Sequence, residues 1–116
     1  MIICVIDDLM FSVRISTAAK RLEADVYFER TADRVITTIR DKQPSLIIFD
    51  LNSTRMQPLE ALKALKSDPA LQPIRTLGYV SHTDTATIAA ARAAGIDEVM
   101  ARSAFTEKLG EILTTA

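Results

Sequence analysis

Three aspartates, Asp7, Asp8 and Asp50, are the residues of this chain whose type and spacing could do chemistry. Asp7 and Asp8 follow an apolar run at residues 2–6, and Asp50 ends the run LIIFD. If these runs are neighbouring strands, the carboxylates share one small volume and raise one another's proton affinity unless a cation neutralises them. Magnesium suits such a group, because it takes one or two carboxylates together with water and phosphate oxygens. With the charge screened, a carboxylate oxygen of Asp50 could attack a phosphoryl group and form an acyl phosphate.

A plainer explanation exists for each aspartate taken alone. An aspartate after a strand often caps the following helix, and this would be enough to explain Asp8. Asp50 is harder to explain in this way, because it lies several residues before Pro58, where the next helix could begin. We therefore favour a functional site for the three together.

The segments that must position these aspartates alternate between apolar runs, typical of buried strands, and stretches with apolar residues at helical spacing. Apolar runs at residues 2–6, 26–28, 46–49, 76–80 and 99–101 are typical of strands covered on both faces. A segment with apolar residues at helical spacing follows each run. For these helices we expect Thr31 to be an N-cap, Pro58 to lie in a first turn and Gly95 to end the alanine-rich helix at residues 85–94.

Five strands alternating with five helices predict an α/β fold with a parallel sheet, because parallel neighbours need right-handed crossover connections. The expected class is the flavodoxin-like (βα)5 doubly wound sheet with strand order 2-1-3-4-5. In that order the first and third strands are neighbours, which would bring Asp7 and Asp8 next to Asp50. Ligands bind such sheets at the carboxyl ends of the strands, where all three aspartates are expected.

Composition limits the other possibilities. The 116 residues predict a single domain over residues 1–116. Fourteen Lys and Arg against fifteen Asp and Glu leave a net charge of −1, which disfavours direct binding to nucleic acid or to a membrane surface.

Cys4 is the only cysteine, so one chain cannot form a disulfide or a thiolate metal site. The short opening run MIICVI is neither a signal peptide nor a membrane span, and we expect a cytoplasmic protein.

Four segments, VIDD, IIFDLN, MQPLEALKALKSDPAL and AARAAGIDEVMARSAF, together resemble the receiver domains of response regulators, the CheY-like family, and the resemblance covers essentially the whole chain. VIDD supplies the acidic pair Asp7 and Asp8, and IIFDLN supplies the phosphoacceptor Asp50. MQPLEALKALKSDPAL is similar to the family's third helix and following loop, and AARAAGIDEVMARSAF to its fourth helix through its fifth strand. The resemblance implies Mg²⁺ held by Asp7, Asp8, Asp50 and the backbone carbonyl of Asn52.

The first departure from the family is at its Lys-Pro, where this chain has Arg102 and Ser103. The family's lysine grips the phosphoryl oxygens. Arginine keeps the charge and can bind phosphate with two bonds, although it is longer and planar. We expect Arg102 to do this and to contact Asp50 even without phosphate.

The second departure concerns two positions of the family's switch. Counting back from Gly95 in the family's spacing places Val80 at the hydroxyl position, whereas a loop one residue shorter places Ser81 there. We favour Ser81, which would keep the hydrogen bond to the phosphoryl group. The family's aromatic switch residue corresponds to Val99, which has no ring to move.

The resemblance implies a stand-alone receiver in two-component phosphorelay signalling, and not an enzyme. Asp50 would take a phosphoryl group from a sensor histidine kinase or a phosphotransfer protein. A downstream effector, or a homodimer through the last two helices, would receive the signal, and the faces carrying Ile88 or Phe105 are candidate surfaces. The alternative is a pseudo-receiver that binds protein partners without phosphorylation. The altered lysine, hydroxyl and aromatic positions motivate that alternative.

Overall fold

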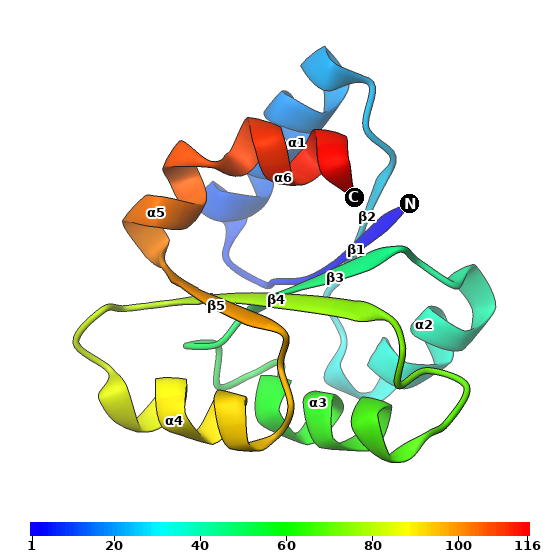
Figure 1. Cartoon of the computed structure of the whole chain (residues 1–116). Helices are drawn as coiled ribbons and strands as arrows, with labels where there is room; N and C mark the ends of the chain where they lie inside the picture. The colour runs from blue at the N-terminus through cyan, green and yellow to red at the C-terminus, as the bar shows by residue number, and fades with distance from the viewer.

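The sheet at the centre of the computed structural model, which describes all residues from 1 to 116, has five parallel strands (Figure 1). The strands are β1 (Ile2–Val5), β2 (Val26–Glu29), β3 (Leu46–Asp50), β4 (Arg75–Val80) and β5 (Glu98–Ala101). Their order is β2-β1-β3-β4-β5, so the predicted flavodoxin-like doubly wound fold is confirmed. The order places β1 beside β3, as the aspartate site requires.

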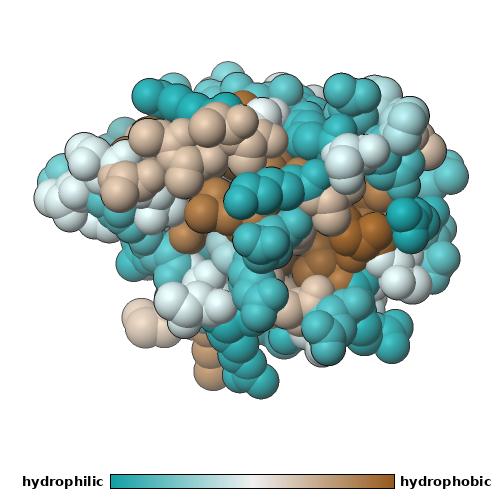
Figure 2. All heavy atoms as spheres, turned by 90° about the horizontal axis from the view of Figure 1, so that it is seen from below, coloured by the Kyte–Doolittle hydropathy of each residue, from teal (hydrophilic) through white to brown (hydrophobic).

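Helices cover both faces of this sheet. They are α1 (Leu9–Leu22), the 3-10 turn η1 (Ala32–Arg34), α2 (Val35–Lys42), α3 (Pro58–Ser67), α4 (Thr85–Ala93), α5 (Arg102–Glu107) and α6 (Leu109–Thr115). In Figure 1, α1, α5 and α6 lie above the sheet, and α2, α3 and α4 lie below it. Seen from below, hydrophobic atoms show between the hydrophilic side chains of the lower layer (Figure 2). None of these helices has the length and apolar character needed to cross a membrane.

The strands divide the core into two halves, because successive side chains of a strand point to opposite faces. Ile48 and Tyr79 pack toward α1, α5 and α6, together with Phe105. Phe49 and Val80 pack toward the opposite helices. Every residue of β1 and β3 is buried, which explains why their sequences read as continuous apolar runs.

Most of the predicted helix ends are confirmed. Pro58 is in the first turn of α3. Gly95 follows α4 with φ of +96°, the left-handed conformation that glycine adopts without strain. Thr31 is the N-cap residue of η1, which runs directly into α2, but its side chain makes no capping hydrogen bond. Its backbone N–H instead donates to the buried carboxylate of Glu29 at 3.1 Å.

The single last helix that the sequence predicted is wrong. The helix ends at Glu107 and restarts at Leu109, with Lys108 between α5 and α6 at φ −96° and ψ 6°. Gly110 is one physical reason, because a glycine inside a helix costs about 1 kcal/mol relative to alanine. Phe105 is fully buried against Tyr79 and cannot itself contribute to an interaction surface.

Candidate functional site

The three aspartates lie at the carboxyl edge of the sheet, as predicted. Val5, the last residue of β1, pairs with Phe49, and Asp50 ends β3 directly after it. Asp7 and Asp8 follow β1 at the same edge, before α1 begins. Asp50 is 5% exposed, whereas Asp7 and Asp8 are partly exposed. The structure therefore places a buried carboxylate behind two accessible ones.

The environment of Asp50 raises the pKa of its carboxyl group above the ordinary value. Burial is the main cause, because removing a carboxylate from water disfavours its charged form. The N–H of Asn52, which donates to Asp50 Oδ1 at 3.0 Å, and the charge of Arg102 act in the opposite direction. The charges of Asp7 and Asp8 add to the increase. The three carboxylates thus repel one another, as expected for groups that share one edge.

Each carboxylate uses one oxygen in the fold and leaves the other without a partner from the protein. In each case Oδ1 is the acceptor. Asp7 Oδ1 accepts from Ser53 Oγ at 2.8 Å, Asp8 Oδ1 accepts from Phe11 N at 3.2 Å, and Asp50 Oδ1 accepts from Asn52 N at 3.0 Å. The Asp8 bond caps α1, so the plainer explanation of that residue also holds. The three Oδ2 atoms remain free to bind a cation.

The donor set fits a magnesium ion that keeps part of its water. No three of the acidic, histidine or cysteine side chains are gathered closely enough to form a complete metal-binding cluster. Magnesium does not need one, because it usually takes one or two carboxylates and retains several waters. The free oxygens of Asp7, Asp8 and Asp50, with the carbonyl of Asn52, are hard oxygen ligands of the kind it prefers.

The structure separates the two candidates for the hydroxyl position. Val80 is fully buried and packs toward α3 and α4, on the opposite side of the sheet from Asp50. Ser81 is partly exposed and lines a pocket that also contains Arg102. Its backbone N–H donates to Asn52 Oδ1 at 2.7 Å, which ties it to the loop after Asp50. Of the two candidates, only Ser81 therefore lies at the surface, in the pocket that Arg102 also lines.

The predicted contact between Arg102 and Asp50 is wrong. None of the ion pairs in the structure includes Arg102. Its guanidinium carbon instead lies 5.4 Å from the centre of the Phe11 ring and 5.9 Å from that of Tyr79. A planar, weakly hydrated guanidinium stacks well on aromatic faces, which explains the preference. Its charge still lowers the pKa of Asp50 from this position.

An aromatic stack beside the site was not foreseen from the sequence. The rings of Phe11 and Tyr79 are stacked with centres 4.7 Å apart, and Phe105 lies 4.7 Å from Tyr79 on another side. Tyr79 is the residue that pairs with Asp50 across β3 and β4. Phe11 appears in the sequence only as one member of an apolar helical stripe, so nothing there distinguishes it from an ordinary core residue.

A link between two loops was also missed. The amide nitrogen of the Asn52 side chain donates to Asp84 Oδ2 at 2.9 Å, while its oxygen accepts from Ser81. Asp84 in turn caps α4 through Thr87 N at 3.1 Å. The loop after the candidate phosphoacceptor is thus joined directly to the start of α4. Val99, at the family's aromatic position, is half-buried and packs into the core on the α3 and α4 side.

We expect Tyr79→Phe to raise the free energy of unfolding by about 1 kcal/mol. The Tyr79 hydroxyl is buried and has no hydrogen-bond partner in the protein. Phenylalanine keeps the stacked ring and removes the cost of this buried polar atom. Urea denaturation of both proteins measures the difference, and a less stable Tyr79→Phe protein would show that the hydroxyl is satisfied.

Comparison with known proteins supports the fold directly. No family model and no curated protein matches the sequence. Among solved structures, the phosphorylated cyanobacterial phytochrome response regulator RcpA has 22% sequence identity and a TM-score of 0.79, over 98% of this chain and 88% of its own. A response regulator from Hahella chejuensis has 17% identity and a TM-score of 0.85, over 97% of this chain and 91% of its own. The Mn²⁺-bound form of response regulator Rcp1 has 17% identity and a TM-score of 0.81, over 99% of this chain and 95% of its own. The fold of this chain is that of response regulator receiver domains.

Proposed function

We propose that this chain is a receiver domain that accepts a phosphoryl group on Asp50 in two-component signalling, and that it is not an enzyme. The observation that carries the proposal is the buried Asp50 carboxylate with a free Oδ2, flanked at the sheet edge by the free oxygens of Asp7 and Asp8. A buried carboxylate with an oxygen that no protein donor satisfies costs free energy, which a bound ligand would recover. The receiver fold of this chain agrees with the proposal.

In the proposed reaction, Asp50 Oδ2 attacks the phosphorus of a phosphohistidine on a sensor kinase or phosphotransfer protein. A bond from Asp50 oxygen to phosphorus forms, and the bond from phosphorus to the histidine nitrogen breaks with its electron pair left on that nitrogen. Bound Mg²⁺ would neutralise charge between the carboxylates and the phosphoryl oxygens. Asp7, Asp8, Asp50 and the Asn52 carbonyl would hold it. The Mn²⁺-bound form of Rcp1 supports a divalent cation at a receiver fold.

Ser81 and Arg102 would bind the new phosphoryl oxygens. Ser81 lies in the loop that follows β4, and its hydroxyl is 3.0 Å from that of Thr83, so it can turn to a new acceptor. Arg102 would leave the ring of Phe11, because a charged phosphoryl group offers a stronger, bidentate partner than an aromatic face. The signal would then pass to an effector protein or to a homodimer through the last two helices.

Intact-mass spectrometry with acetyl phosphate tests the proposal. With Mg²⁺ present, we expect the protein to gain the mass of one HPO₃ group as acetate leaves with the electron pair of the broken phosphorus–oxygen bond. Removing Mg²⁺ with EDTA should abolish the gain, because the clustered carboxylates would then repel the phosphoryl dianion. Absence of any adduct on the parent protein with Mg²⁺ would refute the proposal.

A pseudo-receiver that binds its partner without phosphorylation is the second candidate. The position of Arg102 on the aromatic stack and the valine at position 99 favour it, because both remove parts of the family's switch. Partner binding that requires Mg²⁺ and a phosphoryl mimic at Asp50 would exclude this alternative.

A further inference from the structure

A pocket of about 450 Å³ lies beside the aspartate site, and none of the three aspartates lines it. Its lining residues are almost all polar or basic, with one aromatic ring: Phe11, Arg14, Ser81, His82, Arg102, Ser103 and Thr106. They come from α1, from the loop after β4 and from α5. No carboxylate lines the pocket, so its charge is positive.

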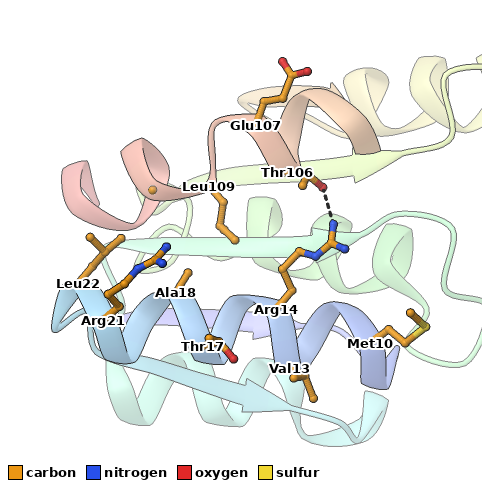
Figure 3. Close-up of a pocket in the computed structure, with 11 residues that line it drawn as sticks. Met10, Val13, Arg14, Thr17, Ala18, Arg21, Leu22, Thr106, Glu107 and Leu109 are labelled. Carbon is orange, nitrogen blue, oxygen red and sulfur yellow. Dashed lines mark hydrogen bonds between the residues drawn. The ribbon is translucent and has the colours of Figure 1, made fainter.

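Two guanidinium groups of this pocket are placed at the same aromatic ring. The guanidinium carbon of Arg14 lies 5.6 Å from the centre of the Phe11 ring, and that of Arg102 lies 5.4 Å from it. Arg14 Nη1 also donates to Thr106 Oγ1 at 3.4 Å, which joins α1 to α5 (Figure 3). Thr106 Oγ1 donates in turn to the carbonyl oxygen of Arg102 at 3.0 Å. The two arginines are therefore positioned by the fold.

Neither arginine has a counter-ion. The ion pairs of the structure include neither Arg14 nor Arg102. Two like charges gathered at one ring repel each other, and an anion placed between them would add two attractions that oppose this repulsion. The pocket is thus built to favour an anion over a neutral ligand.

We propose that this pocket binds a small phosphate-bearing molecule. Guanidinium groups bind phosphate through paired hydrogen bonds, and two of them can engage separate edges of one phosphate. The hydroxyls of Ser81 and Ser103 offer donors for further oxygens, which phosphate has and a carboxylate lacks. The pocket is larger than a single phosphate, and the Phe11 ring supplies an apolar wall for the rest of the molecule.

This site does not depend on phosphorylation of Asp50, but it shares two residues, Ser81 and Arg102, with the proposed reaction. Arg102 lines the pocket and also acts electrostatically on Asp50. A phosphate-bearing ligand held by Arg102 would compete with a phosphoryl group on Asp50 for the same guanidinium. The level of such a molecule would then set how readily the domain responds.

NMR titration of the Asp50→Asn protein tests the pocket in the absence of phosphorylation. We expect inorganic phosphate and pyrophosphate, added at constant ionic strength, to cause saturable shifts in the amides of residues 81–83 and the Nε–H groups of Arg14 and Arg102. Acetate should bind more weakly, because it has only two oxygens. Absence of saturable shifts, or acetate binding as tight as phosphate binding, would overturn the proposal.

Arg14→Gln in the same background should weaken pyrophosphate binding by about tenfold or more, because it removes a charged hydrogen-bond donor. Arg21→Gln is the matched control. Arg21 lies on the same helix toward its other end and lines the neighbouring pocket that Figure 3 draws, not the pocket proposed here. Its affinity should stay within about twofold of the parent, as expected for an exposed charge outside the pocket. Equal losses in the two variants would show only diffuse attraction to a basic surface. The mass measurement on the parent protein is independent, so failure of this site and failure of phosphorylation are separable.

Discussion

Asp50→Asn is expected to lose all phosphorylation by acetyl phosphate and Mg²⁺. Asparagine keeps the oxygen that accepts the Asn52 N–H, so the loop stays bound, but its amide lacks the nucleophilic carboxylate oxygen. Intact mass after incubation measures the effect. Asp25→Asn is the matched control, because it makes the same charge change at an exposed residue directly before β2, at the opposite edge of the sheet. An adduct that persists in Asp50→Asn would place the acceptor elsewhere.

The stability of Asp50→Asn shows whether its loss of phosphorylation could result from misfolding. Burial raises the pKa of Asp50 in the folded protein, so the folded state binds its proton more tightly than the unfolded state does. The stability contributed by this group is therefore present at low pH and is lost as the pH rises through the folded-state pKa. Asparagine removes a buried carboxyl group whose charged form is disfavoured by burial and by Asp7 and Asp8. Asp50→Asn should be the more stable protein at pH 7, with the difference disappearing below about pH 4.

Gly78→Ala is expected to lower the free energy of unfolding by about 2 kcal/mol, or the melting temperature by about 10 °C. A β-carbon at Gly78 would lie 2.6 Å from Leu51 Cδ1 and 2.9 Å from Ile96 Cδ1. Both side chains are buried and have little space to move. The interior strand β4 would have to shift against the loop after Asp50, which contains Leu51. Thermal and urea denaturation measure the loss.

Gly110→Ala is the matched control for that substitution. A β-carbon at Gly110 would meet only Leu22 Cδ1 at 3.9 Å, which is ordinary contact. Because Gly110 is helical, alanine should stabilise the protein by about 0.5–1 kcal/mol. Equal effects at the two glycines would mean that the close approach of Leu51 to Gly78 has no energetic role.

The strands and their positions could be predicted because they are buried on both faces. Runs such as Ile2–Val5 and Leu46–Asp50 have no other stable environment than the centre of a covered parallel sheet. That reasoning also put Asp7, Asp8 and Asp50 at one edge, because each directly follows such a run. The continuous apolar runs are visible in the sequence, so the strands and the residues that follow them could be located from it.

Side-chain direction could not be predicted in the same way. Whether Arg102 reaches Asp50 or the Phe11 ring depends on the register between β3 and β4, which places Tyr79 opposite Asp50. Register is set by packing across the whole sheet and leaves no local signature. The break at Lys108 was missed for a related reason, since the apolar spacing of the last segment continues through it.

That break divides the end of the chain into two parts with different attachments. Arg102 is the first residue of α5, whereas α6 packs along α1 on the far side of Lys108. A movement of Arg102 toward a phosphoryl group would act first on α5, which the turn at Lys108 separates from α6. The change would then reach the surface through the six residues of α5, about 1.7 turns of helix, while α6 kept its contacts with α1.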